Sequence, residues 1–367
     1  MGMIEKAAQM ARRFVLPGEM DTLAPYGEGH INHTFRVTLK NSGEAVILQR
    51  ISPVAFHEPR QVMQNVALVT GHLRKAVERR GGDTKRECLS LLPSLSGDSC
   101  EMDEENACWR AYLFIPDSVT YQRVENEAVF REAGRAFGRF QGDLADLNAG
   151  SLYETIPAFH NTPDRVRQFC SALKKDSAGR SALAGSEIRF VLERAAYANT
   201  LLRQAEGGRL PLRVTHNDTK LNNVLMDAKT GKALCVVDLD TVMPGLAAYD
   251  FGDAIRFGAN TAPEDERDLS RVHFSEPLYQ AYLEGYLQEA GSLLTRAEID
   301  SLPIGAWMMT YECGMRFLAD YLSGDVYFHI QRQDDNLARA RCQFALLRDM
   351  EDKLSPNLIR EETSNAK

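Results

Sequence analysis

The chain has 367 residues, 44% of them hydrophobic, and carries a formal net charge of −8. This length is enough for two parts that each bury a core, and it is long for one compact domain. The acidic balance and the lack of a dense Lys or Arg run argue against nucleic acid or an anionic membrane as partner. We therefore expect a small-molecule substrate.

Cysteine usage and the N-terminal segment both indicate a cytoplasmic protein. The seven cysteines are scattered and show no C-x-x-C pairing, which is typical of reduced thiols and not of disulfides or a zinc site. No run of eighteen apolar residues predicts a membrane span. Residues 4–15 show an amphipathic helical pattern, ended by Pro17-Gly18, in place of a signal-peptide core.

Up to residue 115 the patterns predict a small antiparallel sheet with one long helix. A glycine-containing turn leads into alternating residues, which predicts a hairpin. The expected elements are a hairpin at 26–37, strands at 45–50, 90–95 and 107–115, and a helix over 60–77. We place the boundary between two lobes here, so that 1–115 form the first lobe and 116–367 the second.

Beyond residue 115 the periodicity becomes helical. Apolar residues recur at spacings of three and four at Phe130, Ala133, Phe137, Phe140, Leu144 and Leu147, which predicts a buried helix face. A helix is expected to start at Thr162, as N-cap, with Pro163 at its first position. Further helices are predicted at 186–206, 276–290, 295–322 with a break near Pro303, and 334–354.

Polar residues gather at strand ends between positions 213 and 240. Short apolar runs at 212–214, 224–226 and 233–237 predict a strand followed by a hairpin. Asp218 lies after the first run, Asn223 five positions later, and Asp238 at the end of the hairpin. Transfer of a γ-phosphoryl group needs one carboxylate for the acceptor hydroxyl, and further oxygen ligands for magnesium. The order therefore indicates a phosphotransferase with Asp218 as catalytic residue and Asn223 and Asp238 as metal ligands.

Two neighbouring residues fit structural roles. His216 is expected to hold the shape of the loop through a bond from its ring to the backbone. Asp250, in the run Y-D-F-G-D at 249–253, comes after Asp238 has already taken the metal position, so we interpret it as a structural acceptor paired with Arg256. The alternative for all these Asp and Asn residues is that they only form turns, as these residue types often do.

Several longer runs carry a family resemblance. H-N-D-T-K-L-N-N-V-L followed by V-V-D-L-D resembles the aminoglycoside phosphotransferase and choline kinase superfamily, whose fold is similar to that of protein kinases. The runs that resemble the bacterial N-acetylhexosamine 1-kinases lie at 26–35, 213–223, 238–245, 249–259 and 311–322. The resemblance implies an α+β fold of two lobes, an N-terminal antiparallel sheet lobe and a mainly helical C-terminal lobe.

The same resemblance implies a site for ATP. Its expected contacts are the glycine loop at Gly27 and Gly29, the hinge at Phe114-Ile115, Gln49 and Lys220. Superfamily members carry a phosphate-binding lysine in the third strand and a glutamate partner in the following helix. This chain has Gln49 at the first position and Asn65 on the facing turn of the helix. Arg50, Lys220 or a loop amide are the candidates that replace the lysine.

The acceptor is expected to lie along the helix over 302–322. Glu312, Arg316 and Asp320 fall at i, i+4 and i+8 on one stripe, which is either an exposed salt-bridge ladder or the wall of a sugar site. The expected substrate-binding residues are His30, Asn32, Asp240, Arg316 and Asp320.

Together these patterns predict a cytoplasmic MgATP-dependent kinase that phosphorylates the anomeric hydroxyl of N-acetylglucosamine or N-acetylgalactosamine. The sugar follows from the resemblance alone. The alternatives are a kinase of another small alcohol, such as an aminoglycoside, choline or homoserine, and a non-catalytic nucleotide-binding regulator. Retention of Asp218, Asn223 and Asp238 argues against the regulator.

Overall fold

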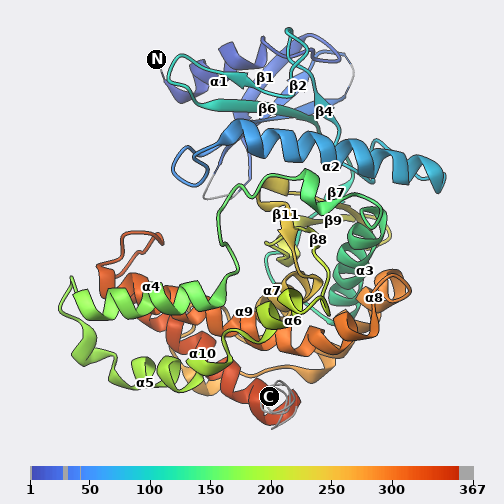
Figure 1. Cartoon of the computed structure of the whole chain (residues 1–367). Coiled ribbons are helices and arrows are strands. Elements are labelled where there is room, and N and C mark those ends of the chain that lie inside the picture. The colour runs from blue at the N-terminus through green and yellow to red at the C-terminus, as the bar shows by residue number, and fades with distance from the viewer. Residues whose placement is uncertain (1, 28–31, 42, 355–367) are drawn as a thin grey trace. The chain divides into compact units, whose positions relative to one another are not determined.

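The computed structural model describes residues 2–27, 32–41 and 43–354 (Figure 1). The chain divides into two compact units, and each unit is formed by three separate segments of the sequence. The first unit comprises 1–120, 143–157 and 223–244, and the second comprises 121–142, 158–222 and 245–367. The chain therefore returns to the first unit twice. The second of these segments, 223–244, carries the hairpin that ends at Asp238.

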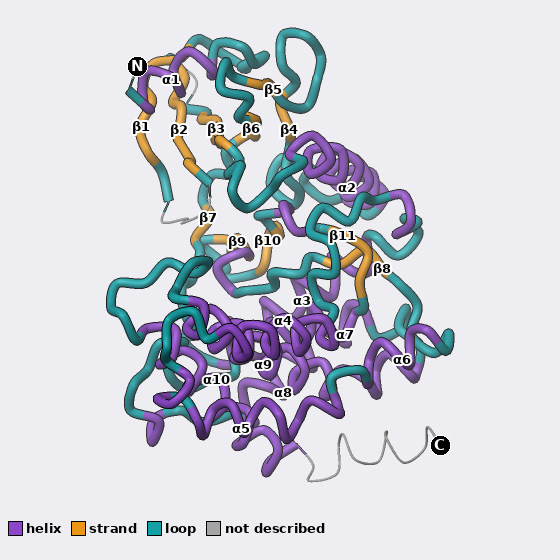
Figure 2. The backbone as a smooth tube through the Cα atoms, turned by 60° about the vertical axis from the view of Figure 1, so that its left-hand side comes forward, coloured by secondary structure: helices purple, strands orange, loops and turns teal. Residues whose placement is uncertain are grey.

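The first unit is built on an antiparallel sheet with the strand order β1-β2-β3-β6-β4, with β5 paired to β6 (Figure 2). The strands are β1 (Met20–Pro25), β2 (His33–Leu39), β3 (Ala45–Arg50), β4 (Leu91–Leu92), β5 (Glu101–Met102) and β6 (Cys108–Leu113). One sheet face packs against α1 (Met3–Ala11) through a core that includes Phe35, Leu48 and Trp109. Because strand side chains alternate between faces, the residues next to these three lie on the opposite face.

The first unit also contains a long helix and a smaller sheet. The helix is α2 (Pro59–Arg79), and the smaller sheet has the order β10-β9-β7. Its strands are β7 (Ser118–Val119), β9 (Val224–Asp227) and β10 (Ala233–Val236), and β11 (Met243–Gly245) follows them. The β9–β10 hairpin is the one that the apolar runs of the sequence predict.

The second unit is mainly helical. Its helices are α3 (Glu127–Asp143), α4 (Thr162–Lys175), α5 (Gly185–Arg194), α6 (Thr200–Glu206), α7 (Ala247–Gly258), α8 (Glu276–Ala290), α9 (Arg296–Ser323) and α10 (Asp335–Leu354), with the short strand β8 (Arg213–Thr215). The 3₁₀ turns of the chain are η1 (Ala149–Ser151), η2 (Ser181–Leu183), η3 (Ala195–Tyr197), η4 (Leu221–Asn223), η5 (Leu239–Thr241) and η6 (Leu269–Arg271). Helix α9 lies against α4, α7 and α10, as Figure 1 shows, and is the central element of this unit.

Several helices differ from the sequence prediction, and α7 was not predicted. The helix expected over 186–206 is divided, with the η3 turn separating α5 from α6. The expected break near Pro303 is absent, because α9 continues through this proline for 28 residues. A proline inside a helix removes one backbone hydrogen bond, and here close packing against α7 on the same turn supports the helix. The helix α4 is capped by the side chain of Asn161, which leaves Thr162 at its first turn.

All seven cysteines lie in the described residues and are free thiols. Across residues 2–27, 32–41 and 43–354, no helix is both long and apolar enough to cross a membrane.

Candidate functional site

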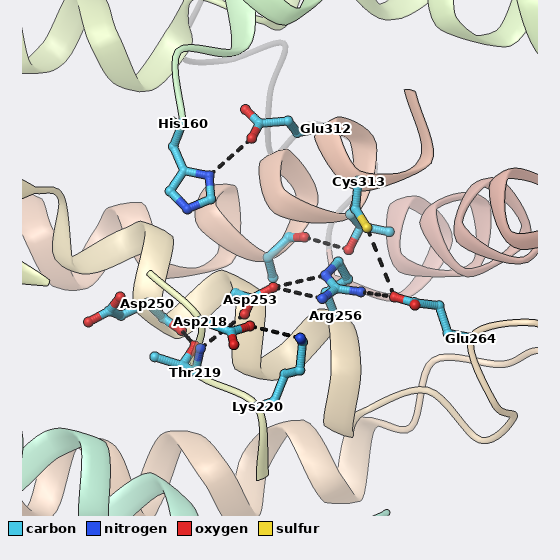
Figure 3. A network of polar contacts seen from close by, with 12 residues as sticks. His160, Asp218, Thr219, Lys220, Asp250, Asp253, Arg256, Glu264, Glu312 and Cys313 are labelled. Atoms are coloured by element: carbon cyan, nitrogen blue, oxygen red, sulfur yellow. Dashed lines mark hydrogen bonds and ion pairs between the residues drawn. The ribbon is translucent and has the colours of Figure 1, made fainter. Parts of the chain in front are cut away.

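The loop that follows β8 is held by two carboxylates of α7 in the second unit (Figure 3). Asp250 accepts hydrogen bonds from the backbone N–H groups of His216 (2.8 Å) and Asn217 (2.7 Å). Asp253, one helical turn later, accepts a bond from the backbone N–H of Thr219 (3.0 Å). The backbone of Asn217 is left-handed, with φ of 63°. Because these contacts fix the loop on both sides of residue 218, they set the position of Asp218.

The surroundings of the two carboxylates are buried and well bonded. Asp250 is 1% exposed, also accepts a bond from the amide of Gln141 (3.2 Å), and has a pKa raised by burial. Asp253 receives bonds from Nε and Nη2 of Arg256, whose Nη1 pairs with Glu264. The predicted pair between Arg256 and Asp250 is therefore wrong, since the arginine lies three residues along α7 from Asp253 and binds that carboxylate instead.

His216 and Asp218 complete the loop. The ring of His216 packs edge-on against Phe137 and Phe140, at 5.5 and 5.8 Å between ring centroids. Its Nδ1 accepts a bond from the backbone N–H of Asp218 (3.3 Å). The carboxylate of Asp218 pairs with Lys220 at 2.9 Å, and the charge of Asp218 raises the pKa of this lysine. The side chain of Asp218 is 28% exposed, so it is open to a ligand that approaches the loop.

The two predicted metal ligands lie at one end of the β9–β10 hairpin in the first unit. Val224 pairs with Val236, and the backbone N–H of Val237 donates to the carbonyl of Asn223 (2.9 Å). This register brings Asn223 level with the residue that precedes Asp238. Asp238 is exposed and has left-handed backbone angles, with φ and ψ both 60°.

The donor chemistry of this hairpin end fits a hard cation. Asn223 offers an amide oxygen and Asp238 a carboxylate, and Mg²⁺ is held in proteins by one or two such ligands together with waters and substrate phosphates. In the described part of the chain no group of three or more His, Cys, Asp or Glu side chains is placed to hold a metal ion. A cation at Asn223 and Asp238 would therefore take its remaining ligands from water or from a nucleotide.

The predicted nucleotide-binding residues of the first unit are only partly described. Gly27 has φ of 79°, a conformation that glycine adopts easily. Gly29 and His30 lie outside the described residues. The backbone N–H of Phe114 donates to the carbonyl of Ala45 (2.9 Å), which continues the sheet beyond β6, and Ile115 is buried.

Gln49, at the position of the missing lysine, is bonded on both sides. Its Nε2 donates to the hydroxyl of Thr34 (3.0 Å). Its Oε1 accepts a bond from Nε of Arg110 (2.9 Å). The amide is thus part of a cross-strand row on β2, β3 and β6, and sequence reasoning missed its third member, Arg110. The available signal was one charged residue inside the mostly apolar run predicted as a strand at 107–115.

Asn65, at the position of the missing glutamate, is 2% exposed and binds backbone groups. Its Nδ2 donates to the carbonyls of Tyr153 (2.8 Å) and Val242 (3.0 Å), and its Oδ1 accepts a bond from the backbone N–H of Tyr153 (2.8 Å). It therefore ties α2 to the segment that follows the η5 turn.

Asp240 and Asn32, which we predicted to bind substrate, are in contact with each other. The carboxylate of Asp240 pairs with Nη1 of Arg110 through one oxygen. Its other oxygen accepts a bond from Nδ2 of Asn32 (2.7 Å), and Oδ1 of Asn32 accepts a bond from the backbone N–H of Ser52 (3.0 Å). Asp240 is 3% exposed, so its contacts within the chain dominate its surroundings.

The stripe on α9 is not an exposed ladder. Glu312 is fully buried and accepts a bond from the hydroxyl of Thr162 (2.7 Å), while Nδ1 of His160 lies 3.0 Å from it (Figure 3). Burial raises the pKa of Glu312, but His160 and Arg316 lower it by more, so the net shift is downward.

Asp320 is also buried and serves the chain itself. It accepts bonds from three backbone N–H groups, those of Val326, Tyr327 and Phe328, each at 2.9 Å, and from the amide of Asn336. This carboxylate holds the loop after α9, which leaves it little capacity for a ligand.

Arg316 lies between these two carboxylates along α9 and differs from both. Its guanidinium lies 5.5 to 5.9 Å from the ring centroids of Phe159, Tyr327 and Phe328. Within the residues that the structure describes, no hydrogen bond or close ion pair holds it, although its charge acts on Glu312 one turn earlier in α9. Nε2 of the buried His160 likewise has no hydrogen-bond partner in the described chain. Sequence reasoning missed His160, because nothing near it in the sequence marks its contact with Glu312.

The chain is similar to known proteins both in sequence and in fold. Residues 22–297 match the model of the phosphotransferase enzyme family. Similar solved structures include a microcompartment-associated aminopropanol kinase, with 17% identity and a TM-score of 0.65 over 97% of this chain and 99% of that chain. An aminoglycoside phosphotransferase from Alicyclobacillus acidocaldarius has 12% identity and a TM-score of 0.63 over 97% of this chain and 96% of that chain.

A choline kinase from Cryptosporidium parvum is similar as well, with 12% identity and a TM-score of 0.59 over 99% of both chains. At such identities the likeness shows the fold, which is the protein-kinase-like fold with an antiparallel N-terminal sheet and a mainly helical C-terminal part. The predicted α+β fold class is therefore confirmed.

Proposed function

Because the chain belongs to the phosphotransferase enzyme family, we propose that it transfers the γ-phosphoryl group of MgATP to the anomeric hydroxyl of N-acetylglucosamine or N-acetylgalactosamine. The observation that carries the reaction type is the loop around Asp218, whose backbone is bonded to Asp250 and Asp253 while its carboxylate stays partly exposed. Support for the sugar comes from the sequence runs that resemble N-acetylhexosamine 1-kinases.

In this proposal Asp218 orients the acceptor hydroxyl and takes its proton. Phosphoryl transfer has a loose transition state, so positioning and charge stabilisation account for most of the catalysis. Lys220 keeps its positive charge beside Asp218 and binds phosphate oxygens of the nucleotide. His216 and Asp250 keep the loop in shape and touch no substrate.

Asn223 and Asp238 hold magnesium in this proposal. The bound ion supplies positive charge that offsets the charge of the phosphates. The glycine loop at Gly27 and Gly29 covers the phosphates with its backbone, and the backbone at Phe114 and Ile115 binds the adenine edge. Both polar atoms of the Gln49 side chain are bonded within the sheet, to Thr34 and to Arg110, so below we propose a positioning role for Gln49 in place of the predicted direct ATP contact.

Arg316 is the strongest candidate for binding the acceptor. A planar guanidinium beside aromatic rings, with no hydrogen bond or close ion pair in the described chain, can donate hydrogen bonds to hydroxyl or acetamide oxygens. His30 stays a predicted contact. We leave Asp320 out of the proposed sugar site, because its oxygens accept four bonds within the chain.

The charge of Arg316 also bears on the alternatives. Choline and aminoglycosides are cations, which are bound by aromatic rings or by carboxylates. Here the rings of Phe159, Tyr327 and Phe328 already surround a cation. If Arg316 binds the acceptor, like charges repel such substrates, so a neutral sugar is favoured over either of them.

A substrate panel tests this proposal. ADP release is measured with N-acetylglucosamine, N-acetylgalactosamine, glucose, choline, homoserine and an aminoglycoside under identical MgATP. We expect the two N-acetylhexosamines to have the highest kcat/KM, and Arg316→Gln to raise the sugar KM while leaving the ATP KM unchanged. Preference for choline, homoserine or the aminoglycoside contradicts the sugar assignment. ADP release with none of these acceptors favours the non-catalytic regulator.

A further inference from the structure

A row of polar side chains crosses the main sheet of the first unit on the face opposite its core. Thr34 pairs with Gln49 across β2 and β3, and Gln49 pairs with Arg110 across β3 and β6. Their side chains are joined by the two hydrogen bonds of the Gln49 amide, at 3.0 and 2.9 Å. Arg110 is 1% exposed, so a full positive charge lies inside the unit.

A buried guanidinium is tolerated only when its charge is compensated. Removing an ion from water costs several kcal/mol, and only a well-placed opposite charge offsets that cost. The compensating group is Asp240, which is 3% exposed and pairs with Nη1 of Arg110. Burial lowers the pKa of Arg110, but the charges of Asp240 and Asp238 and the hydrogen bond to Asp240 raise it by more, so this arginine stays protonated.

The pair connects the sheet to the turn that follows the proposed metal ligand. Asp240 lies in η5, two residues after Asp238, and its second oxygen is held by Asn32 (2.7 Å). On the far side of the same turn, Asn65 donates to the carbonyl of Val242 (3.0 Å). The segment from 240 to 242 is therefore held at both ends within the first unit.

Gln49 and Asn65, at the positions where the resemblance implies lysine and glutamate, both help to fix this turn. Gln49 orients Arg110 through its Nε (2.9 Å), and Asn65 binds Val242 directly. Arg50 and Lys220, which were candidates to replace the lysine, form ion pairs elsewhere. Arg50 points to Asp103 and Glu105, at 3.8 and 3.5 Å, and Lys220 pairs with Asp218.

We propose that Arg110, oriented by Gln49 and paired with Asp240, is a positioning residue that fixes the turn after Asp238 for metal binding, and that Gln49 and Asn65 support this turn from the positions where the resemblance implies lysine and glutamate. The role of Arg110 depends on the proposed function of Asp238 as a magnesium ligand. Arg110 itself touches neither substrate nor metal. Asp240, which we predicted to bind the sugar, belongs to this positioning network.

The test compares nucleotide binding with and without magnesium. Arg110→Met alone leaves Asp240 as a buried unpaired carboxylate and is expected to fold poorly. The informative variant is therefore Arg110→Met/Asp240→Asn, which removes both charges together. Calorimetry measures the Kd of ADP in the presence of Mg²⁺ and in EDTA, and hydrogen exchange of the free protein reports on the amides of 238–242.

We expect the double variant to fold and to bind metal-free ADP within about twofold of the parent, while its Mg²⁺-dependent gain in affinity falls about tenfold, or about 1.4 kcal/mol. Exchange in the turn should be faster than in the parent, with exchange in β3 and β6 unchanged. Arg110→Lys, which keeps the charge but loses the fixed geometry of the guanidinium, should give an intermediate loss.

Two controls separate this proposal from others. Lys40→Met removes a cation next to β2 that pairs with Glu19, away from the turn, and should leave both Kd values unchanged. Asp238→Ala should abolish the magnesium dependence altogether. If the double variant keeps the parental magnesium dependence, or loses both modes of ADP binding equally, Arg110 is not a positioning residue. If ADP binding by the parent does not depend on magnesium, the assignment of Asp238 as a metal ligand is wrong. The role of Arg110, which depends on that assignment, is then wrong as well.

Discussion

At the scale of single residues, the partly exposed carboxylate of Asp218 is unlike its buried neighbours. The carboxylates of Asp250 and Asp253 accept hydrogen bonds from backbone N–H groups, and Asp253 also pairs with Arg256. The carboxylate of Asp218 pairs with Lys220, a cation that a bound phosphate would share. We therefore assign the catalytic role to Asp218 and a structural role in the loop to Asp250 and Asp253.

Asp218→Asn is therefore expected to fold and bind nucleotide like the parent while kcat falls about 10²- to 10⁴-fold, since only the group that orients the hydroxyl and accepts its proton is lost. Steady-state ADP release and ADP calorimetry on the same preparation measure both quantities. Turnover within a few-fold of the parent would remove Asp218 from the catalytic role.

Gln49 allows a further test, because the superfamily resemblance implies a lysine at this position. In this chain the new ammonium would face the buried guanidinium of Arg110 and remove the acceptor of its Nε. We expect Gln49→Lys to lower the free energy of unfolding by about 1–3 kcal/mol and to reduce activity, through like-charge repulsion and a lost buried hydrogen bond. Urea unfolding checks this.

The matched variant is Gln49→Glu, which keeps the acceptor and adds a negative charge beside Arg110. It should be no less stable than the parent. A Gln49→Lys protein with parental stability and higher activity would mean that the bond between Gln49 and Arg110 is not needed to hold the turn after Asp238.

At the scale of elements, α7 is the platform for the loop around Asp218, and α9 supports α7. The two helices approach so closely that a Cβ added at Gly305 would lie 2.0 Å from the carbonyl oxygen of Ala248, and one at Gly252 would lie 2.3 Å from that of Gly305. Glycine is required here by the separation of the backbones. This contact transmits the position of α9 to Asp250 and Asp253.

Gly305→Ala should lower the free energy of unfolding by about 1–3 kcal/mol, since the backbones must move apart, and should reduce kcat because α7 carries the acceptors of the loop. Denaturant unfolding with parallel assays measures both effects. Gly71→Ala in α2 is the control, because nothing lies within 4 Å of its added Cβ. The control should gain about 0.5–1 kcal/mol from helix propensity. Equal stability of the parent and Gly305→Ala would show that the α7–α9 contact adapts.

Local patterns predicted most elements, and contacts distant in sequence explain what they missed. Periodicity placed α8 at its observed bounds, and the apolar runs placed the β9–β10 hairpin. The partner of Arg110 is 130 residues away, and that of His160 is 152 residues away. No spacing rule reaches so far. The break expected at Pro303 failed for a similar reason, because the packing of α9 against α7 outweighs the local preference.

At the scale of the whole molecule, family and fold agree but leave the acceptor open. The family model spans residues 22–297, and the similar kinases act on chemically different acceptors according to their names. The features of this chain that bear on its acceptor are local: the aromatic surroundings of Arg316 and the sequence runs that resemble hexosamine 1-kinases. The position of the transferred phosphoryl group therefore decides the assignment.

The most direct measurement is the structure of the product made from N-acetylglucosamine or N-acetylgalactosamine and MgATP. An anomeric hydroxyl is more acidic than an ordinary sugar alcohol, so Asp218 has only to orient it and take its proton late. We predict that ³¹P–¹H correlation spectra show phosphorus coupled to the anomeric proton, that the product has no reducing end, and that the 1-deoxy sugar binds without turnover. A phosphorylated product that still reacts as a reducing sugar would place the phosphoryl group on another hydroxyl and contradict the 1-kinase assignment.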